Sequence, residues 1–231
     1  MAARVRVAVL GVGSLGRQHA RIYGEMHRQG AVELVGVYDT DSALAKSIAE
    51  KHGTAALGSV EATAAAADAL SVVTPTITHH ALAKPLLEQG KHLLVEKPMT
   101  DHAEQAAELV RLAGQHDCVL QVGHIERFNP VFNYLREAAR EPRFIESHRL
   151  SPYPARSMDI GVVLDLMIHD LDIVLAFVLS PVEHIDAAGV RVLSTSEDIA
   201  NARLRFANGC VANLTVSRVS PERLRKIRVF S

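Results

Sequence analysis

The chain has 231 residues, 48% of them hydrophobic, and its 25 basic and 26 acidic residues leave a formal net charge of −1. This length suggests one large or two ordinary domains with a substantial core, and the balanced charge excludes the electrostatic footprint of a nucleic-acid or anionic-membrane protein. We find no charged-then-apolar leader and no apolar run of about 20 residues, so we expect a cytoplasmic protein. Cys118 and Cys210 lack the C-x-x-C spacing of metal sites, and we expect both to be reduced, buried thiols in strands.

Three glycines near the N-terminus predict a dinucleotide-binding turn. An apolar, β-branched strand at residues 5–10 leads into the spacing G-x-G-x-x-G, and a helix-compatible sequence follows. In this fingerprint the first glycine allows a tight turn, the second lets the backbone approach a pyrophosphate, and the third lets helix and strand pack closely. The helix N-terminus then offers unpaired N–H groups to the phosphates. The residues expected to hold the cofactor here are Gly11, Gly13, Ser14, Leu15 and Gly16.

An acid after the second strand strengthens this interpretation. Residues 32–38 are typical of a strand. Asp39 follows, about 20 residues beyond the last glycine, where the fingerprint places a carboxylate that accepts hydrogen bonds from the adenosine ribose. The same charge would repel the 2′-phosphate of NADP, so Asp39 favours NAD, with NADP the less favoured cofactor. A glycine-rich turn alone often only connects two elements, but the full order of strand, glycines, helix, strand and acid favours dinucleotide binding.

The first half of the chain alternates strands with amphipathic helices, which is typical of a doubly wound parallel sheet in an α/β fold. We expect Pro85 in the first turn of its helix, because proline lacks an N–H group. We also expect Thr100 or Asp101 to cap a helix with Glu104 in its first turn, as in a capping box. The expected strands are 5–10, 32–38, 69–73, 92–95 and 119–122, and the expected helices are 18–29, 42–52, 60–67, 81–89 and 101–115.

The alternation stops near residue 123, and the rest of the chain groups its strands after its helices. This order indicates an α+β domain with a largely antiparallel open sheet. Asn208-Gly209 is a strong hairpin signal within it, and the alternating basic residues 223–228 fit the solvated face of a last strand. We therefore expect a Rossmann domain at 1–122 and a substrate and oligomerisation domain at 123–231, incomplete at its C-terminus. Its expected helices are 130–140 and 162–179, and its expected strands are 144–150, 182–193, 199–206 and 211–219.

The helix expected at 162–179 carries an unusual polar stripe. At about 100° per residue, Asp165, His169 and Asp172 fall on one narrow face of an otherwise apolar helix. Burying such groups without partners is costly, so they should be paired or line a cleft. An imidazole suits general acid/base catalysis, with Asp165 orienting His169 or holding charge. The alternative is a stripe that faces solvent, and a metal site would need a third ligand that we cannot identify, so we expect no metal.

Lys97 is the second candidate for acid/base chemistry. It follows the strand at 92–95, and open α/β sheets bind ligands at the carboxyl ends of their strands. A lysine in that place could exchange a proton with a substrate. For Lys97 taken alone, a surface lysine at a strand end is the simpler interpretation.

Two further polar stretches could line a ligand site. Residues 74–79 end one strand and begin the next helix, so they could line the nicotinamide pocket or merely cap that helix. Residues 123–130 lie at the domain junction, where ligand sites tend to occur, so they could face a ligand or only brace the domains. The candidates are Thr74, Pro75, Thr76, His79, Glu96 and Lys97 for the cofactor, and Lys97, His124, Arg127, Asn129, Asp165 and His169 for the substrate.

Taken together, these motifs resemble the Gfo/Idh/MocA family of nicotinamide-dependent oxidoreductases. The resemblance covers the whole chain and implies a Rossmann domain followed by an α+β domain, whose open sheet covers the active site and commonly forms a homo-oligomer interface. It also implies that Lys97 and His169 do the acid/base work on a substrate hydroxyl, with Asp165 beside them, and that Lys97-Pro98 is a cis peptide. The motifs that carry it are residues 11–16, 74–79, 96–98, 123–130 and 165–169.

More narrowly, residues 122–130, 165–172, 217–218 and 225–228 are similar to the family branch that oxidises the 3-hydroxyl of UDP-N-acetylglucosamine to a ketone, for lipid A-type saccharides. Met167 replaces the glycine of the family's D-x-G-x-H pattern, which implies the same chemistry in a pocket of different shape. Family members continue beyond Ser231, so the last sheet strands would be missing, with consequences for oligomerisation and full activity.

The hypothesis that follows is an NAD-dependent sugar-nucleotide dehydrogenase. Its substrate hydroxyl would lie between nicotinamide C4, Lys97 and His169, with Lys97 as the proton acceptor, although the two roles could be exchanged. Two alternatives stay open. One is a family dehydrogenase that acts on a free polyol such as inositol or on another sugar, and the other is a non-catalytic NAD-binding regulator.

Overall fold

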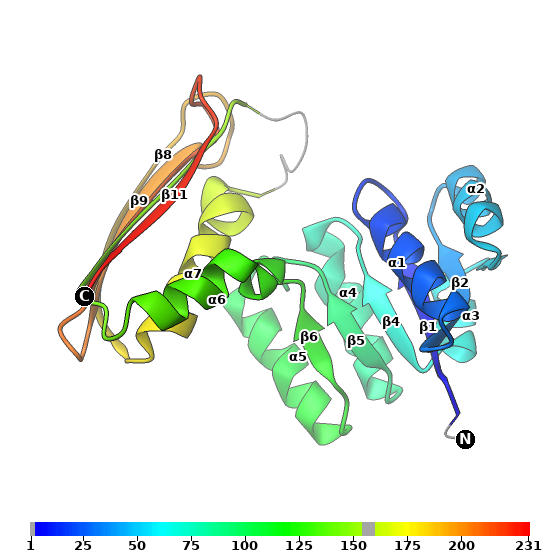
Figure 1. Cartoon of the computed structure of the whole chain (residues 1–231). Helices are drawn as coiled ribbons and strands as arrows, with labels where there is room; N and C mark the ends of the chain where they lie inside the picture. Colours follow the sequence, from blue (N-terminus) through cyan, green and yellow to red (C-terminus); the bar gives the residue numbers. More distant parts are fainter. Residues whose placement is uncertain (1–2, 154–159) are drawn as a thin grey trace. The chain divides into compact units, whose positions relative to one another are not determined.

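The computed structural model describes residues 3–153 and 160–231 (Figure 1). The chain divides into two compact units, Met1–Gly123 and His124–Ser231, and each is described by itself below. The sequence had placed this division one residue earlier, between 122 and 123.

The first unit is built on a six-stranded sheet in which every neighbouring pair of strands is parallel. The strand order is β3-β2-β1-β4-β5-β6, the order of a dinucleotide-binding Rossmann fold. The chain changes direction across the sheet between β1 and β4, and such a switch point opens a crevice for ligands at the carboxyl ends of the strands. The strands are β1 (Val5–Leu10), β2 (Val32–Tyr38), β3 (Ala55–Ala56), β4 (Ala69–Val72), β5 (His92–Val95) and β6 (Leu120–Val122).

The helices of this unit pack into separate apolar cores. Ala20 of the first helix and Ile48 of the second pack with Val9 and Val37 of the sheet, while the remaining helices pack in a second cluster around Leu70. This two-faced burial explains why the strands are nearly continuous apolar runs in the sequence. The helices are α1 (Gly16–Arg28), α2 (Ser42–His52), α3 (Val60–Ala66), α4 (Thr76–Glu88) and α5 (Ala103–Gln115).

Two predictions about helix starts are wrong. Helix α4 begins at Thr76, directly after Pro75, so Pro85 lies near its C-terminal end and not in its first turn. The earlier start is stabilised by the Thr78 hydroxyl, which donates to the Pro75 carbonyl at 2.7 Å.

Helix α5 lacks the predicted capping box. It begins at Ala103, with His102 at the N-cap and no side-chain cap bond. The Thr100 hydroxyl donates instead to the His102 carbonyl at 2.8 Å, so it is used within the loop before the helix. The predicted start of α2 is confirmed, since the Asp41 side chain accepts hydrogen bonds from the N–H groups of Ala43 and Leu44.

The second unit is built on a five-stranded sheet with the order β11-β7-β10-β9-β8. Only the pair β7–β10 is parallel, so the expected largely antiparallel sheet is confirmed. The predicted hairpin joins β9 to β10, and Gly209 has a φ of +85° in its turn. The strands are β7 (Phe144–Leu150), β8 (Val182–Val190), β9 (Ile199–Phe206), β10 (Val211–Ser217) and β11 (Leu224–Phe230).

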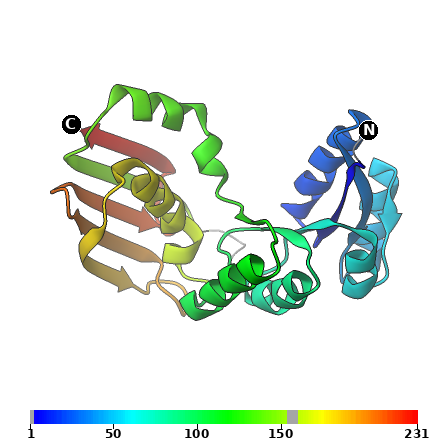
Figure 2. The same ribbon diagram turned by 90° about the horizontal axis from the view of Figure 1, so that it is seen from below.

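One face of this sheet is covered by helix α7, as Figure 2 shows. Val174 and Phe177 of that helix pack in one apolar cluster with Ile145 of β7 and Leu214 of β10. The chain after β7 is irregular from Ser151 to Tyr153. The helical segments are the 3-10 turn η1 (Ile125–Phe128), α6 (Pro130–Ala138), the π-helical turn η2 (Val163–Met167) and α7 (Ile168–Val178).

The helix predicted at 162–179 therefore does not begin as a regular α-helix. Its first turn is π-helical, and the Ile168 N–H reaches back five residues to the Val163 carbonyl. Neither cysteine lies in a strand, contrary to prediction: Cys118 precedes β6 and Cys210 lies in the hairpin before β10. Both thiols are free, and burial raises the pKa of each.

Among the residues that the structure describes, no helix is both long and apolar enough to cross a lipid bilayer.

Candidate active site

The glycine loop between β1 and α1 has the geometry that its spacing predicts. Gly11 has a φ of +84°, which side chains rarely adopt, and its N–H donates to the Tyr38 carbonyl at 2.8 Å, which joins the loop to the end of β2. A Cβ atom at Gly16 would overlap with the Gly11 carbonyl oxygen. A Cβ atom at Gly13 would meet no heavy atom within 4 Å in the described chain. Gly11 and Gly16 are therefore required by the fold itself, whereas Gly13 leaves its backbone accessible to a ligand.

A cavity of about 620 Å³ opens at the switch point of the sheet. It lies where strands β1, β2 and β4 end, as expected for this topology. Among its described lining residues Asp39 is the one charged side chain, and no lysine or arginine contributes. The lining is Leu10, Gly11, Gly13, Tyr38, Asp39, Thr40, Val60, Val73, Thr74, Pro75, Ile77, Thr78, Ala81 and Leu82.

The Asp39 carboxylate is held in place from two sides. Its Oδ2 atom accepts a hydrogen bond from the Val12 N–H at 2.7 Å, and its Oδ1 atom accepts one from the Asp41 N–H at 3.0 Å. A carboxylate has about four lone-pair positions, so both oxygens retain capacity for ribose hydroxyls. The carboxylate thus links the glycine loop to the start of α2 at the edge of the cavity.

The loop after β4 contributes residues that the sequence proposed for the cofactor. Thr74 and Pro75 line the cavity, whereas Thr76 is buried at the first position of α4. His79 is almost fully buried, with Nε2 at 2.9 Å from the Thr74 carbonyl and Nδ1 at 3.0 Å from the Pro98 carbonyl. His79 therefore connects the loops that follow β4 and β5.

The loop after β5 contains Lys97, and the bond between Lys97 and Pro98 is cis, as the family resemblance implies. The neighbouring Glu96 is buried, and its Oε1 atom accepts from the Nε2 of His19 at 3.0 Å. Its Oε2 atom accepts from the backbone N–H of Lys97 at 3.1 Å. Burial by itself raises the pKa of Glu96, but these bonds outweigh burial and lower the pKa overall. Each carboxylate oxygen of Glu96 therefore accepts a hydrogen bond from within the protein. The cofactor contact that the sequence predicted for Glu96 stays a prediction.

His19 is the partner of Glu96, and the sequence analysis did not single it out. It lies on α1, just after the glycine loop, and its Nδ1 is 3.3 Å from the Ser71 hydroxyl, which is 2.9 Å from the Tyr23 hydroxyl. This chain of polar contacts connects α1 through β4 to the lysine loop. A Cβ atom at Gly123 would lie 2.6 Å from Glu96 Oε1, so glycine is needed there as well. The one sign of this contact in the sequence was a histidine on the same face of the first helix as its buried residues.

Replacing Glu96 with glutamine should destabilise the protein in a pH-dependent way. The amide would present an N–H group to one of the two donors, so we expect a loss of about 1.5–3 kcal/mol at pH 7. Because folding lowers the pKa of Glu96, its stabilising contribution is complete above about pH 4.5 and is lost as the pH falls through its folded-state pKa. Urea unfolding at pH 7 and at pH 4 measures this. The difference in free energy of unfolding between wild type and Glu96→Gln should be smaller at pH 4 than at pH 7. Glu50→Gln, at an exposed position on α2, should unfold with nearly the wild-type free energy at both pH values.

In the second unit, Asp165 lies within the π-helical turn η2, and His169 follows in the first turn of α7. Both are half-buried, and the Asp165 N–H donates to the Gly161 carbonyl at 3.0 Å. The nearby Glu126 interacts with this site: burial raises its pKa, but a bond from Asn129 and the charges of Arg149, His169 and Arg225 lower it overall. π-Helical turns occur frequently at functional sites, which supports the choice of this segment.

Asp172, the third residue of the predicted stripe, is paired, which is one of the two surroundings expected for such a buried group. That carboxylate is buried and receives Arg127 in a bidentate ion pair, with Nε at 2.8 Å from Oδ2. The bond to Asp172 raises the pKa of Arg127. Asp172 thus fixes η1 to α7. The sequence left open whether Arg127 faces a ligand or braces the two domains, and this ion pair lies entirely within the second unit.

The other two candidates at residues 123–130 have different surroundings. Asn129 caps α6, since its side chain accepts from the Val131 N–H at 3.0 Å. The Nδ1 atom of His124 is buried and finds no hydrogen-bond partner within residues 3–153 and 160–231. Such an atom is costly unless a partner satisfies it, so His124 stays a candidate for substrate binding, whereas Asn129 has a structural explanation as the cap of α6. The same described residues hold no group of three or more His, Cys, Asp or Glu suited to a metal ion.

Two family models match the chain and together span most of it. Residues 5–124 match the oxidoreductase family with an NAD-binding Rossmann fold, and residues 135–231 match the GFO/IDH/MocA C-terminal domain. The chain belongs to the Gfo/Idh/MocA family of oxidoreductases. The predicted family, Rossmann fold and NAD cofactor are thereby confirmed, and the cavity of the first unit, with its open glycine and its acidic edge, fits that dinucleotide.

Individual relatives are similar over 73–98% of this chain. UDP-N-acetylglucosamine 3-dehydrogenase from Acidithiobacillus ferrooxidans is 41% identical over 227 residues, which are 98% of this chain and 71% of that protein. Its solved structure has a TM-score of 0.91 and covers 99% of this chain and 74% of that one. Inositol 2-dehydrogenase from Rhizobium meliloti is 30% identical over 73% of this chain, which spans 53% of that protein.

Proposed function

We propose that this family member oxidises the 3-hydroxyl of UDP-N-acetylglucosamine to the 3-keto sugar nucleotide with NAD. The observation that carries the proposal is the 41% identity, over 98% of the chain, to a protein named for that activity. The inositol dehydrogenase relative is less similar and covers less of the chain. The residues with acid/base chemistry that the sequence singled out, Lys97, Asp165 and His169, are all present.

We assign Lys97 as the proton acceptor for the substrate hydroxyl. It follows β5 directly, at the carboxyl edge of the Rossmann sheet where this topology binds ligands. Its backbone N–H is held by Glu96, which fixes the point from which the side chain extends. NAD, when bound, supplies the hydride acceptor. A positioned base of this kind contributes about 10²–10⁴-fold to turnover.

His169 hydrogen-bonds to the same substrate oxygen in this proposal and stabilises the charge that develops there as the proton leaves. Asp165, one helical turn earlier, orients the imidazole or complements its charge. We assign this role to Asp165 because the other two carboxylates near His169 on the helix have arginine partners. Asp170 is paired with Arg149 at 3.0 Å, and Asp172 is paired with Arg127. His124, with its buried Nδ1 atom, is proposed to donate to or accept from the substrate.

The test is a substrate screen by absorbance of NADH. The protein is incubated with UDP-N-acetylglucosamine, UDP-N-acetylgalactosamine, UDP-glucose, myo-inositol and scyllo-inositol, each with NAD and with NADP. We expect turnover with UDP-N-acetylglucosamine and NAD. Turnover with a free inositol in preference to every UDP-sugar would replace the proposal by a polyol dehydrogenase. Stoichiometric NAD binding without turnover of any of these compounds would favour a non-catalytic regulator.

The choice of NAD over NADP should depend on Asp39. Replacing it with alanine removes the carboxylate at the edge of the cavity and its bond to the Val12 N–H, so we expect KM for NAD to rise about tenfold and discrimination against NADP to fall. Steady-state kinetics with both cofactors measure this. Asp41→Ala is the matched control. It removes a nearby carboxylate that caps α2 but does not line the cavity. An unchanged NAD/NADP ratio in Asp39→Ala would exclude the assigned role.

We also propose that the protein forms a homo-oligomer through the five-stranded sheet. The support is the face of β9 opposite α7, where Asn201, Arg203 and Arg205 are exposed while the alternate residues are buried. Sedimentation velocity on the purified chain tests the association, and Arg203→Glu should weaken it if this face is the interface.

A further inference from the structure

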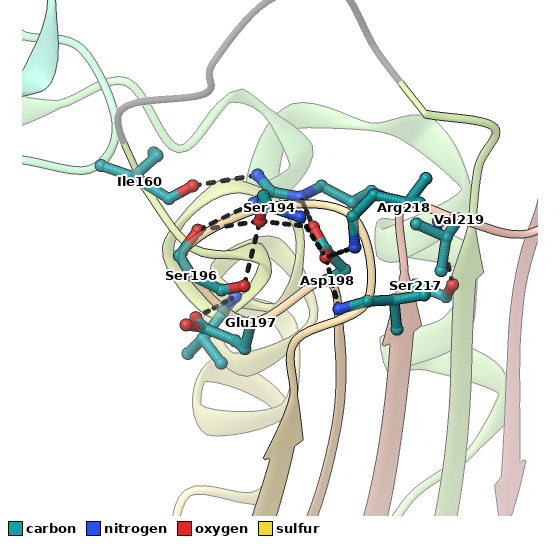
Figure 3. Close-up of polar contacts among 11 residues, drawn as sticks. Ile160, Ser194, Ser196, Glu197, Asp198, Ser217, Arg218 and Val219 are labelled. Carbon is teal, nitrogen blue, oxygen red and sulfur yellow. Dashed lines mark hydrogen bonds and ion pairs between the residues drawn. The ribbon is translucent and has the colours of Figure 1, made fainter.

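A fully buried ion pair lies at the end of β10 in the second unit. Arg218 and Asp198 are both completely excluded from solvent, and Nε of the arginine donates to Oδ1 of the aspartate at 2.8 Å (Figure 3). The Oδ2 atom of Asp198 also accepts from the N–H groups of Val192, Leu193 and Ser194, at 2.7–2.9 Å. These bonds outweigh burial and lower the pKa of Asp198 strongly. The loop at 191–198 is thus folded tightly around one carboxylate.

The same cluster reaches the backbone that leads into the π-helical turn. The Nη1 of Arg218 donates to the Ile160 carbonyl at 3.0 Å, and its Nη2 donates to the hydroxyls of Ser194 and Ser196 at 2.8 Å. Arg218 therefore connects the loop at 191–198 to the residue just before Gly161. A lysine could not make these contacts, because it lacks the planar fork of donors.

Glu197 adds two bonds to the first turn of the helical segment. Its carbonyl accepts from the Val162 N–H at 3.0 Å, and its Oε1 atom accepts from the Val163 N–H at 3.3 Å. A Cβ atom at Gly161 would overlap with the Glu197 carboxylate, so glycine permits this close approach. N–H groups in a first helical turn have no partner within the helix. Here a loop distant in sequence satisfies two of them, and its carboxylate also suits the positive end of the helix.

We propose that Glu197 and Arg218 are positioning residues for Asp165 and His169. The bonded backbone, Ile160 to Val163, ends two residues before Asp165, whose N–H donates to Gly161. π-Helical turns are rare and occur mostly as single turns joined to α-helices, so we expect these external contacts to help hold η2 in its observed geometry. Misplacing a catalytic group by about 1 Å can lower turnover about 10²-fold. The inference rests on the proposed function, because it takes Asp165 and His169 as the groups that act on substrate.

The test compares Glu197→Ala with Glu197→Gln, which retains an oxygen for the Val163 N–H. With UDP-N-acetylglucosamine and NAD, we expect kcat of Glu197→Ala to fall about 10–100-fold with little change in KM for NAD, and Glu197→Gln to retain most of the turnover. Ser180→Ala is the control, because it removes one loop hydrogen bond elsewhere in the same unit. Equal kcat in Glu197→Ala and Ser180→Ala would overturn the inference.

A double-mutant cycle with His169→Ala separates this inference from the proposed function. If Glu197 acts through the helix, adding Glu197→Ala to His169→Ala should cost less than about threefold further, because coupled residues are non-additive. Full additivity would mean that Glu197 acts elsewhere. If the wild-type protein does not turn over UDP-N-acetylglucosamine, the proposed function fails. If His169→Ala alone leaves kcat unchanged, the role proposed for His169 fails, whatever Glu197 does.

A measurement without turnover completes the test. Long-range ¹H–¹⁵N spectra of the histidine rings, with the His169 signals assigned by their loss in His169→Ala, report the surroundings of that imidazole. We expect the signals to shift in Glu197→Ala and in Arg218→Lys but to stay near their wild-type positions in Glu197→Gln. The result against the inference is that Glu197→Ala and Arg218→Lys lower the thermal unfolding midpoint but leave the His169 signals unchanged. Glu197 and Arg218 would then have only a structural role.

Discussion

Replacing Lys97 with alanine should lower kcat about 10²–10⁴-fold while NAD affinity stays close to that of the wild type. The side chain extends from the carboxyl end of β5, whereas the residues that line the dinucleotide cavity belong to the ends of β1, β2 and β4 and to α3 and α4. A base that removes the hydroxyl proton acts mainly in the transition state, so its loss lowers kcat more than it changes cofactor binding. Initial rates with UDP-N-acetylglucosamine, together with calorimetric titration of NAD, measure the two effects.

Two controls make this result specific. Lys46→Ala removes an exposed lysine from α2 of the same unit and should change neither quantity. Lys97→Arg retains a positive charge but remains protonated at every accessible pH, so it should be nearly as inactive as Lys97→Ala. Near-normal turnover in Lys97→Ala would falsify the assignment of Lys97 as the proton acceptor. Normal turnover in Lys97→Arg alone would indicate that charge matters and proton transfer does not.

Replacing Gly13 or Gly16 of the first loop with alanine should impair the protein in two different ways. Gly13→Ala places a methyl group where no described atom lies within 4 Å. We expect its thermal unfolding midpoint to stay near that of the wild type and its NAD affinity to fall at least tenfold, because the methyl group would occupy the approach of the pyrophosphate. Gly16→Ala places the methyl group against the Gly11 carbonyl oxygen. It should lose about 1–3 kcal/mol of stability as well as NAD binding.

Gly114→Ala is the matched control for both variants. This glycine lies inside α5, is exposed, and its added methyl group would also meet no described atom within 4 Å. Alanine has the higher helix propensity, so the variant should gain up to about 1 kcal/mol and bind NAD normally. Denaturant unfolding and NAD titration of all three variants decide the matter. If Gly13→Ala binds NAD as tightly as the wild type, the glycine loop does not hold the pyrophosphate.

These expectations depend on how much of the site is local in the sequence. The glycine spacing, Asp39 after the second strand and the Glu96-Lys97-Pro98 triplet are short motifs, and the residues within each are close together because the chain connects them. The parallel sheet of the first unit follows from the alternation of strands and helices. Its strand order, strand β3 and the starts of α4 and α5 were not predicted.

The polar pairs could not be predicted, because they join residues far apart in the chain. His19 and Glu96 come from α1 and the end of β5, and Arg127 and Asp172 come from η1 and α7. Helical periodicity placed Asp172 on the same stripe as Asp165, but periodicity describes one helix and carries no information about an arginine that packs against it. The stripe was also drawn for a regular α-helix, whereas the segment begins with a π-helical turn.

By itself the sequence determined the family, the Rossmann fold and the dinucleotide loop, since each depends on spacing along the chain, and it named the candidates for acid/base chemistry. Only the tertiary structure decided what each polar group is bonded to. In the structure Glu96 is hydrogen-bonded to His19, and Arg127 is paired with Asp172. Arg218 and Glu197 are hydrogen-bonded to the segment before Asp165. The physical reason is burial: a polar group removed from water must find a partner, and which partner is within reach depends on how distant segments pack.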